Sequence, residues 1–230
     1  MAQIPFPKDK TDQADDYNER GISFFNLKNY AEAIKEFTRA IKIIGNDPDY
    51  YYNRGLAYYS MKMYKESAAD YTKAVEMNPD NADFRNALGS VLEDMGDLDG
   101  ALSNFEKAIS LEDDVPDYYY NRGNVYYRRK QIDLALNDYS RAVSLNSADQ
   151  IFLFRRYKLY DEIGDNSRAL NDLDSLIRLS PSNTFYLKKR VETLIKMNAR
   201  RDAEKTLELA LEMSPGDGEL RDLQARVARI

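Results

Sequence analysis

The sequence PDYYYNRGLAYY, which starts at Pro48, returns as PDYYYNRGNVYY at Pro116. The two copies start 68 residues apart, which is twice 34. Cutting the chain every 34 residues outward from these copies needs no insertion. It gives six segments, at residues 14–47, 48–81, 82–115, 116–149, 150–183 and 184–217. A period of about 20 to 50 residues indicates stacked structural repeats.

Small and large residues recur at matching places in the six segments. The eighth position holds Gly21, Gly55, Gly89, Gly123, Tyr157 and Val191. The twentieth is alanine in five segments, and the twenty-fourth is Phe, Tyr or Leu in all six. Positions 4, 7, 8 and 11 share one face of a helix, and positions 20, 24 and 27 share one face of a second helix. The columns therefore predict two helices per segment, whose backbones approach closely at the small residues.

Turn and cap residues mark the ends of these predicted helices. Short polar or glycine-containing breaks, such as Gly96-Asp97, separate the two helices of a segment. Proline at the thirty-second position, as in Pro79, cannot extend the second helix and therefore ends it. Asp47 followed by Pro48 is typical of an N-cap with proline in the first turn of the next helix.

A 34-residue helix-turn-helix unit with these columns resembles the tetratricopeptide repeat, whose pattern combines W-x2-L-G-x2-Y, A-x3-F, A and P. Six segments of 34 residues carry the resemblance, which makes 204 of the 230 residues. It implies an all-α fold, a right-handed α-solenoid of six tandem repeats. Residues 218–230 place Leu220, Leu223 and Val227 on one stripe and predict a C-terminal capping helix. Residues 1–13 are predicted to be a disordered tail.

Composition excludes several kinds of chemistry. The chain has no His and no Cys, so an imidazole base, a thiolate nucleophile, a disulfide and a Cys/His zinc site are all excluded. There is no phosphate-binding glycine motif, and we expect no enzyme activity, no cofactor and no metal. No secretory leader and no run of 18 apolar residues is present, so we expect a cytoplasmic protein without a membrane span.

The resemblance implies that positions 2, 5, 6, 9, 12 and 13 of each segment line a concave groove. Asparagine amides there suit the backbone of a peptide, and tyrosine offers a rigid apolar surface with a polar tip. The alternative is that the asparagines bridge neighbouring helices and that the tyrosines pack between them. The candidate partner-binding residues are Asn18, Tyr52, Asn53, Tyr59, Tyr120, Asn121, Asn124, Tyr127, Arg128, Arg155, Lys158 and Lys189.

Charge is unevenly distributed along the chain. Residues 1–115 hold 13 Lys+Arg against 22 Asp+Glu, a net of -9, while residues 116–230 hold 20 against 17, a net of +3. The groove positions follow this division and could orient a peptide of complementary charge. The clamp that related repeats use for chaperone C-terminal carboxylates is incomplete, because Asn86, Ser90 and Ile151 occupy three of its places. A looser anionic peptide site around the late cations stays open.

These observations favour a noncatalytic protein–protein interaction scaffold that holds a peptide or partner helix in its groove. Two alternatives belong to other classes. Single-stranded RNA binding is supported by the late basic positions and opposed by the pI of about 5.0. A self-assembling scaffold would use an open end of the array, and the sequence does not decide the oligomeric state.

Overall fold

The computed structural model describes residues 9–230, which form thirteen α-helices and no strand. Residues 1–8 of the predicted tail lie outside the described residues. The helices are α1 (Lys10–Asn26), α2 (Tyr30–Ile43), α3 (Pro48–Ser60), α4 (Tyr64–Met77), α5 (Ala82–Met95), α6 (Leu98–Leu111), α7 (Pro116–Arg128), α8 (Ile132–Leu145), α9 (Gln150–Glu162), α10 (Asn166–Leu179), α11 (Thr184–Lys196), α12 (Arg200–Met213) and α13 (Gly218–Val227). The predicted all-α class is confirmed.

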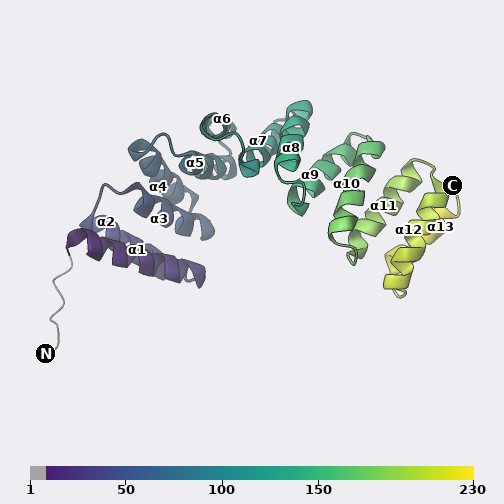
Figure 1. Ribbon diagram of the computed structural model, residues 1–230, viewed down its shortest axis with the longest axis horizontal. Helices are drawn as coiled ribbons and strands as arrows, with labels where there is room; N and C mark the ends of the chain where they lie inside the picture. The colour runs from purple at the N-terminus through teal and green to yellow at the C-terminus, as the bar shows by residue number, and fades with distance from the viewer. Residues whose placement is uncertain (1–8) are drawn as a thin grey trace. The chain divides into compact units, whose positions relative to one another are not determined.

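The chain divides into two compact units, one that ends at Val125 and one that runs from Tyr126 to Ile230. In the first unit, α1 packs on α2, α3 on α4 and α5 on α6, and each pair contacts the next (Figure 1). In the second unit, α9 packs on α10, α11 on α12, and α13 contacts both α11 and α12. Each unit is therefore a stack of helix pairs. We number the six 34-residue segments repeat 1 to repeat 6.

The turn between the two helices of each repeat uses the same backbone device. The fifteenth residue of every repeat has positive φ, from 55° to 87°. These residues are Lys28, Lys62, Gly96, Lys130, Gly164 and Asn198. The next residue donates its amide hydrogen to the carbonyl oxygen five residues earlier, as from Asp97 to Leu92 at 2.9 Å. This left-handed C-cap closes the first helix and turns the chain into the second.

Side-chain caps set where the first helices begin. Asp47 Oδ1 accepts from the amide nitrogen of Asp49 at 2.9 Å, and Pro48 is the first residue of α3, as predicted. Helix α1 differs from the prediction. Asp9 Oδ1 accepts from the amide nitrogen of Asp12 at 2.8 Å, so α1 starts at Lys10. The predicted disordered tail over residues 1–13 is therefore wrong for residues 10–13, because an N-cap lies before them.

The glycine column makes room for an aromatic ring. A Cβ atom on Gly55 would lie 2.7 Å from the ring of Tyr71, and one on Gly89 would lie 2.7 Å from the ring of Phe105. Both rings belong to position 24 of the same repeat. The aromatic side chain at position 24 therefore packs directly against the glycine, where a larger residue at position 8 would overlap it.

Repeats 5 and 6 fill this pair of positions differently. Position 8 becomes Tyr157 or Val191, and position 24 becomes leucine. All four side chains of these two pairs are buried, with Leu173 at 0% exposure. A side chain larger than glycine on the first helix with a leucine in place of the ring on the second keeps the interior filled, which is what close packing requires.

A buried ion pair joins the two helices of several repeats. Arg54 Nε and Nη2 donate to the two carboxylate oxygens of Asp70, both at 2.8 Å. Arg156 forms the same bidentate pair with Asp172 at 3.0 and 2.6 Å, and Asp172 is 2% exposed. Repeat 3 carries an uncharged pair at these positions, Leu88 and Asn104. Position 7 with position 23 is therefore a second packing column, which the sequence analysis did not single out.

Helix α13 ends the described chain. Leu220, Leu223 and Val227 are buried in one cluster with apolar residues of α11 and α12. They lie three or four residues apart and so share one stripe of the helix. The stripe matches the sequence pattern of a capping helix. Within residues 9–230, no helix is long and apolar enough to cross a bilayer.

Candidate functional site

The first helices of neighbouring repeats are joined by side-chain hydrogen bonds between residues 35 apart. Asn53 Nδ2 donates to Asn18 Oδ1 at 3.0 Å, between α3 and α1. Asn121 Nδ2 donates to Asn86 Oδ1 at 2.9 Å, between α7 and α5. All four amides are half-buried. The asparagines at candidate positions therefore bridge neighbouring helices, which is the alternative that the sequence left open.

Tyrosine hydroxyls form a second set of bridges on the same helices. Tyr50 donates to Asp15 at 2.5 Å, and Tyr118 donates to Asp83 at 2.7 Å. Burial and the hydrogen bond to Asp15 raise the pKa of Tyr50 well above its ordinary value of 10. These bonds engage acidic groove positions, so part of the early negative charge is already occupied within the chain.

A third set of bridges lies near the C-terminal ends of the first helices. Tyr59 donates to Asp94 at 2.6 Å, and Tyr127 donates to Glu162 at 2.8 Å. The hydrogen bond to Glu162 and burial raise the pKa of Tyr127. Two predicted binding tyrosines are thus positioned by acidic partners on the next first helix.

The other polar and aromatic candidates of the early repeats are also engaged. Tyr52 is half-buried, with its ring centroid 5.0 Å from that of Phe84 and 5.7 Å from that of Tyr71. Burial and the nearby carboxylates raise the pKa of its hydroxyl. Tyr120 and Asn124 are half-buried, and neither lacks an interaction partner. Tyr52 is therefore part of the packing between α3, α4 and α5.

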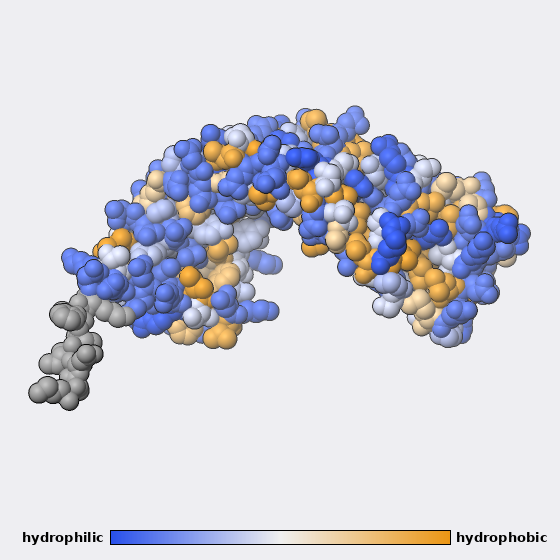
Figure 2. Space-filling model, viewed as in Figure 1, coloured by the Kyte–Doolittle hydropathy of each residue, from blue (hydrophilic) through white to orange (hydrophobic). Residues whose placement is uncertain are grey.

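Helices α9 and α11 present a different surface. Ile151 is 63% exposed and Phe185 is 44% exposed, both at position 2 of their repeats. Phe154, at position 5, joins the two helices, because its ring centroid lies 5.7 Å from that of Phe185 and 6.1 Å from that of Tyr186. Large apolar side chains therefore reach solvent at groove positions where repeats 1 and 3 carry Asp and Asn. In Figure 2, hydrophobic patches lie between hydrophilic residues over the second unit.

Two lysines stand beside this apolar cluster. Lys158 is exposed, lies one turn beyond Phe154 on the same side of α9, and forms no ion pair within residues 9–230. Lys189 Nζ lies 5.6 Å from the centroid of the Phe185 ring and 2.8 Å from Glu192 Oε2. We use the name α9–α11 face for Ile151, Phe154, Lys158, Phe185 and Lys189.

The remaining late cations are paired or lie elsewhere. Lys196 Nζ is 2.5 Å from Asp161 Oδ1, and Lys188 pairs with both Asp217 and Glu219. Arg155 is half-buried on α9 and Arg128 is exposed in the last turn of α7, and both already have interaction partners. Arg155 and Lys158 thus lie on α9 and Lys189 on α11, while Arg128 belongs to α7.

The apolar members of this face are residues that the selection of candidates passed over. Ile151, Phe154 and Phe185 occupy groove positions of the predicted pattern, yet the candidate set favoured Asn, Tyr and basic residues. The available signal was the change of residue class at positions 2 and 5, from Asp and Asn in repeat 1 to Ile and Phe in repeat 5. Within residues 9–230, no group of acidic side chains is arranged to hold a metal ion.

Structure comparison finds similar folds among solved helical-repeat proteins. Pseudomonas aeruginosa PilF matches with a TM-score of 0.76 at 18% identity, over 95% of this chain and 99% of that one. The C-terminal part of a repeat protein from Cytophaga hutchinsonii matches with a TM-score of 0.76 at 18% identity, over 91% and 84%. YrrB, described as a TPR protein with an unusual peptide-binding site, matches with a TM-score of 0.65 at 24% identity, over 82% and 97%. At these identities the likeness concerns the fold alone.

Sequence comparison gave no match among curated proteins. Family models do match. Models described as tetratricopeptide repeat match residues 48–81, 116–149 and 70–103, and one described as TPR repeat matches residues 21–62 and 93–130. The matched residues run together from 21 to 149, which is more than half of the chain. This chain therefore belongs to the tetratricopeptide repeat family.

Proposed function

We propose that this protein is a noncatalytic interaction module that holds a peptide segment of a partner protein against the α9–α11 face. Proteins with this fold generally mediate protein–protein interaction. The partner segment binds at groove positions of α9 and α11.

One observation carries the proposal: exposed apolar side chains beside cations at groove positions of adjacent first helices. Interface centres are enriched in aromatic anchors, and a contiguous exposed apolar patch on a soluble domain marks an interaction site. Phe185 and Ile151 are large and exposed, and the Phe185 ring packs against that of Phe154. Because a rigid aromatic support loses little side-chain freedom on binding, this patch is suited to a hot spot.

The charges beside the patch define the ligand. Lys158 has no carboxylate partner within the described residues, and the ammonium of Lys189 lies near the face of an aromatic ring. A ligand that covers Phe185 with a large apolar side chain would place a flanking carboxylate beside these lysines. The expected ligand is therefore a peptide with a large apolar residue next to Asp or Glu. The description of YrrB as a peptide-binding TPR protein supports a peptide as the ligand class.

A random peptide library displayed on phage and selected on the full chain tests this proposal. The expected enriched motif is an aromatic or leucine side chain flanked by acidic residues. The affinity of the selected peptide is then measured for Phe185→Ala and Lys158→Ala by calorimetry. We expect Phe185→Ala to weaken binding by about tenfold or more, which corresponds to about 1.4 kcal/mol. Lys158→Ala should have a smaller effect that fades at high salt.

Leu134→Ala is the matched control. Leu134 is 45% exposed, close to the 44% of Phe185, but lies on α8, a second helix. We expect it to leave the affinity unchanged. Equal weakening by both variants would contradict the proposed site. A salt-sensitive complex with single-stranded RNA that displaces the peptide would instead support the nucleic-acid alternative.

A further inference from the structure

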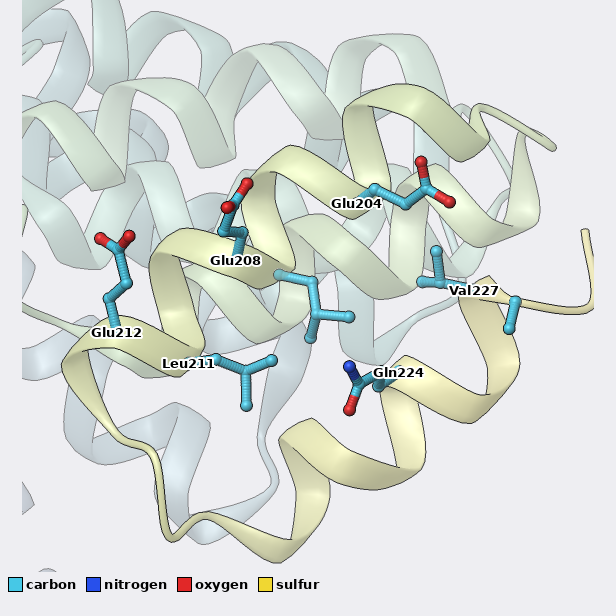
Figure 3. A pocket seen from close by; sticks show the side chains of 8 residues that line it. Glu204, Glu208, Leu211, Glu212, Gln224 and Val227 are labelled. Carbon is cyan, nitrogen blue, oxygen red and sulfur yellow. The ribbon is translucent and has the colours of Figure 1, made fainter.

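A cavity of about 660 Å³ lies between α12 and α13, away from the α9–α11 face (Figure 3). Figure 3 shows three glutamates following one another along α12, with Leu211, Gln224 and Val227 on the sides where the two helices approach. The residues that line the cavity are Glu204, Leu207, Glu208, Leu211, Glu212, Gln224, Val227 and Ala228. The cavity therefore combines an apolar floor with an acidic edge.

The same place one repeat earlier is lined in part by the next second helix. A cavity of about 330 Å³ there is lined by Asp174 and Ile177 of α10, which lie 34 residues before Glu208 and Leu211. Helix α12 contributes Lys205, Thr206 and Leu209 to its lining. Within residues 9–230, no helix takes the corresponding place over the α12–α13 cavity, which is twice as large. A helix placed over the α12–α13 cavity would stand in the position that α12 has relative to the cavity of the preceding repeat.

The cavity of about 330 Å³ also indicates which charge a helix over the α12–α13 cavity would carry. Arg190 Nε lies 2.7 Å from Asp174 Oδ1, and Arg190 also donates to the hydroxyl of Thr206. The residue 34 positions after Arg190 is Gln224, which brings no charge to Glu208. In residues 9–230, neither Glu208 nor Glu212 forms an ion pair, and both are exposed. In repeat 5 the acid at this position, Asp174, has Arg190 beside it. Within residues 9–230, the equivalent acid of repeat 6, Glu208, has no such cation.

We propose that the α12–α13 cavity receives a basic amphipathic helix of a partner protein. The apolar side chains of that helix fill the space between Leu207, Leu211 and Val227. Its Arg or Lys side chains lie beside Glu208 and Glu212, as Arg190 lies beside Asp174. Such a helix repeats the pattern of α12, where Lys205 and Leu209 are one turn apart on the side that covers the earlier cavity.

Charge argues against the N-terminal helix of a second copy of this chain as the occupant. Helix α1 carries Asp12, Asp15 and Glu19, and residues 1–115 hold 13 basic against 22 acidic residues. Placing that helix against the glutamates of α12 would bring like charges together. A basic partner helix meets no such repulsion.

A designed helical peptide is the probe for this site. It is about 18 residues long, so that a helix can form, with leucines three and four residues apart and arginines along one edge. Binding to the full chain is measured by fluorescence anisotropy at low and high salt. Two companion peptides replace the arginines by glutamate or the leucines by serine. We expect only the basic amphipathic peptide to bind, with one site per chain.

Two matched substitutions, Glu208→Lys and Glu106→Lys, test whether the peptide binds at the α12–α13 cavity. Both residues are exposed and occupy position 25 of their repeats, but Glu106 lies on α6. We expect Glu208→Lys to weaken binding about tenfold and Glu106→Lys to change it less than about twofold. Equal weakening by the two variants, or equal binding of the acidic peptide, would overturn the proposal. The proposal would also be overturned if sedimentation without peptide showed a dimer of the chain and Glu208→Lys dissociated that dimer.

Discussion

The α1/α3 pair and the α9/α11 pair use the same four repeat positions for different purposes. In the first pair, Asp15 accepts from Tyr50 and Asn18 accepts from Asn53. The residues 136 positions later are Ile151, Tyr186, Phe154 and Lys189. Asp15, Asn18 and Asn53, which join the early helices, thus correspond to two apolar residues and a lysine, and of these Ile151 is exposed. The same arrangement of helices can therefore use the side chains on its first helices to hold repeats together or leave them for a partner.

The interiors of the repeats differ as well, without a change of helix arrangement inside a repeat. Repeat 3 has Leu88 and Asn104 where repeat 5 has the Arg156–Asp172 ion pair. Repeats 1 to 3 pair glycine with an aromatic ring, whereas repeats 5 and 6 pair tyrosine or valine with leucine. Exchanging these solutions between repeats tests which parts of the pattern matter for stability and which for binding.

The largest effect is expected from breaking the buried ion pair of repeat 5. Arg156→Leu leaves Asp172, which is 2% exposed, without its cation, and we expect a loss of about 3 kcal/mol in the free energy of unfolding. Adding Asp172→Asn recreates the residue pair of repeat 3 and should restore most of that loss. Urea denaturation followed by circular dichroism measures both. A single variant as stable as the parent would show that the pair is dispensable.

A smaller loss is expected from filling the glycine of repeat 1. A Cβ atom at Gly21 would overlap the ring of Phe37, so Gly21→Ala should cost about 2 kcal/mol. Combining it with Phe37→Leu removes the ring that the new methyl group would overlap and should cost less than the sum of the two single changes. Additive costs in this double-mutant cycle would mean that the two side chains do not share the space.

Removing the tyrosine hydroxyl at position 3 of the repeat should affect the stability of the two helix pairs differently. Tyr50→Phe removes a 2.5 Å hydrogen bond to Asp15, and we expect a loss of about 1 kcal/mol. Tyr186, at the same repeat position, lies 3.4 Å from Gln150 Oε1, so Tyr186→Phe should cost less than about 0.5 kcal/mol. Equal costs would contradict this difference between the short hydrogen bond of the early pair and the long one of the late pair.

The smallest effect is a pH dependence carried by the same tyrosines. The folded chain raises the pKa of Tyr50 and Tyr118 through burial and a carboxylate partner. The neutral hydroxyl is therefore favoured in the folded state, and its stabilisation is complete below pH 10 and lost as the pH rises above that value. Urea midpoints between pH 8 and 11 should decline less steeply for Tyr50→Phe combined with Tyr118→Phe. An unchanged slope would contradict this linkage.

The sequence predicted the repeats well because their determinants are local and periodic. The turn at Gly96-Asp97 and the cap at Asp47 depend on residues near in sequence, so the pattern alone located them. The direct contact of Gly55 with the ring of Tyr71 was not predicted, because that ring lies sixteen residues later.

The candidate site was harder to predict because residue type does not show what a side chain already contacts. Asn53 and Tyr59 were chosen for their binding chemistry, but both donate hydrogen bonds to the neighbouring first helix. Phe185 occupied a predicted groove position and was passed over, although the structure leaves it 44% exposed. Partners 35 residues apart become visible only once the repeats are stacked.

The most direct test converts the α9/α11 pair to the bridged arrangement of the α1/α3 pair. The triple variant Ile151→Asp, Phe154→Asn and Lys189→Asn keeps Tyr186 and supplies the other three groups that bridge α1 and α3. Calorimetry with the peptide selected on the parent chain is the measurement, with a urea midpoint to verify folding. We predict a folded variant whose affinity falls by about 100-fold, which is about 2.8 kcal/mol. A folded variant that binds the peptide as tightly as the parent would contradict the account.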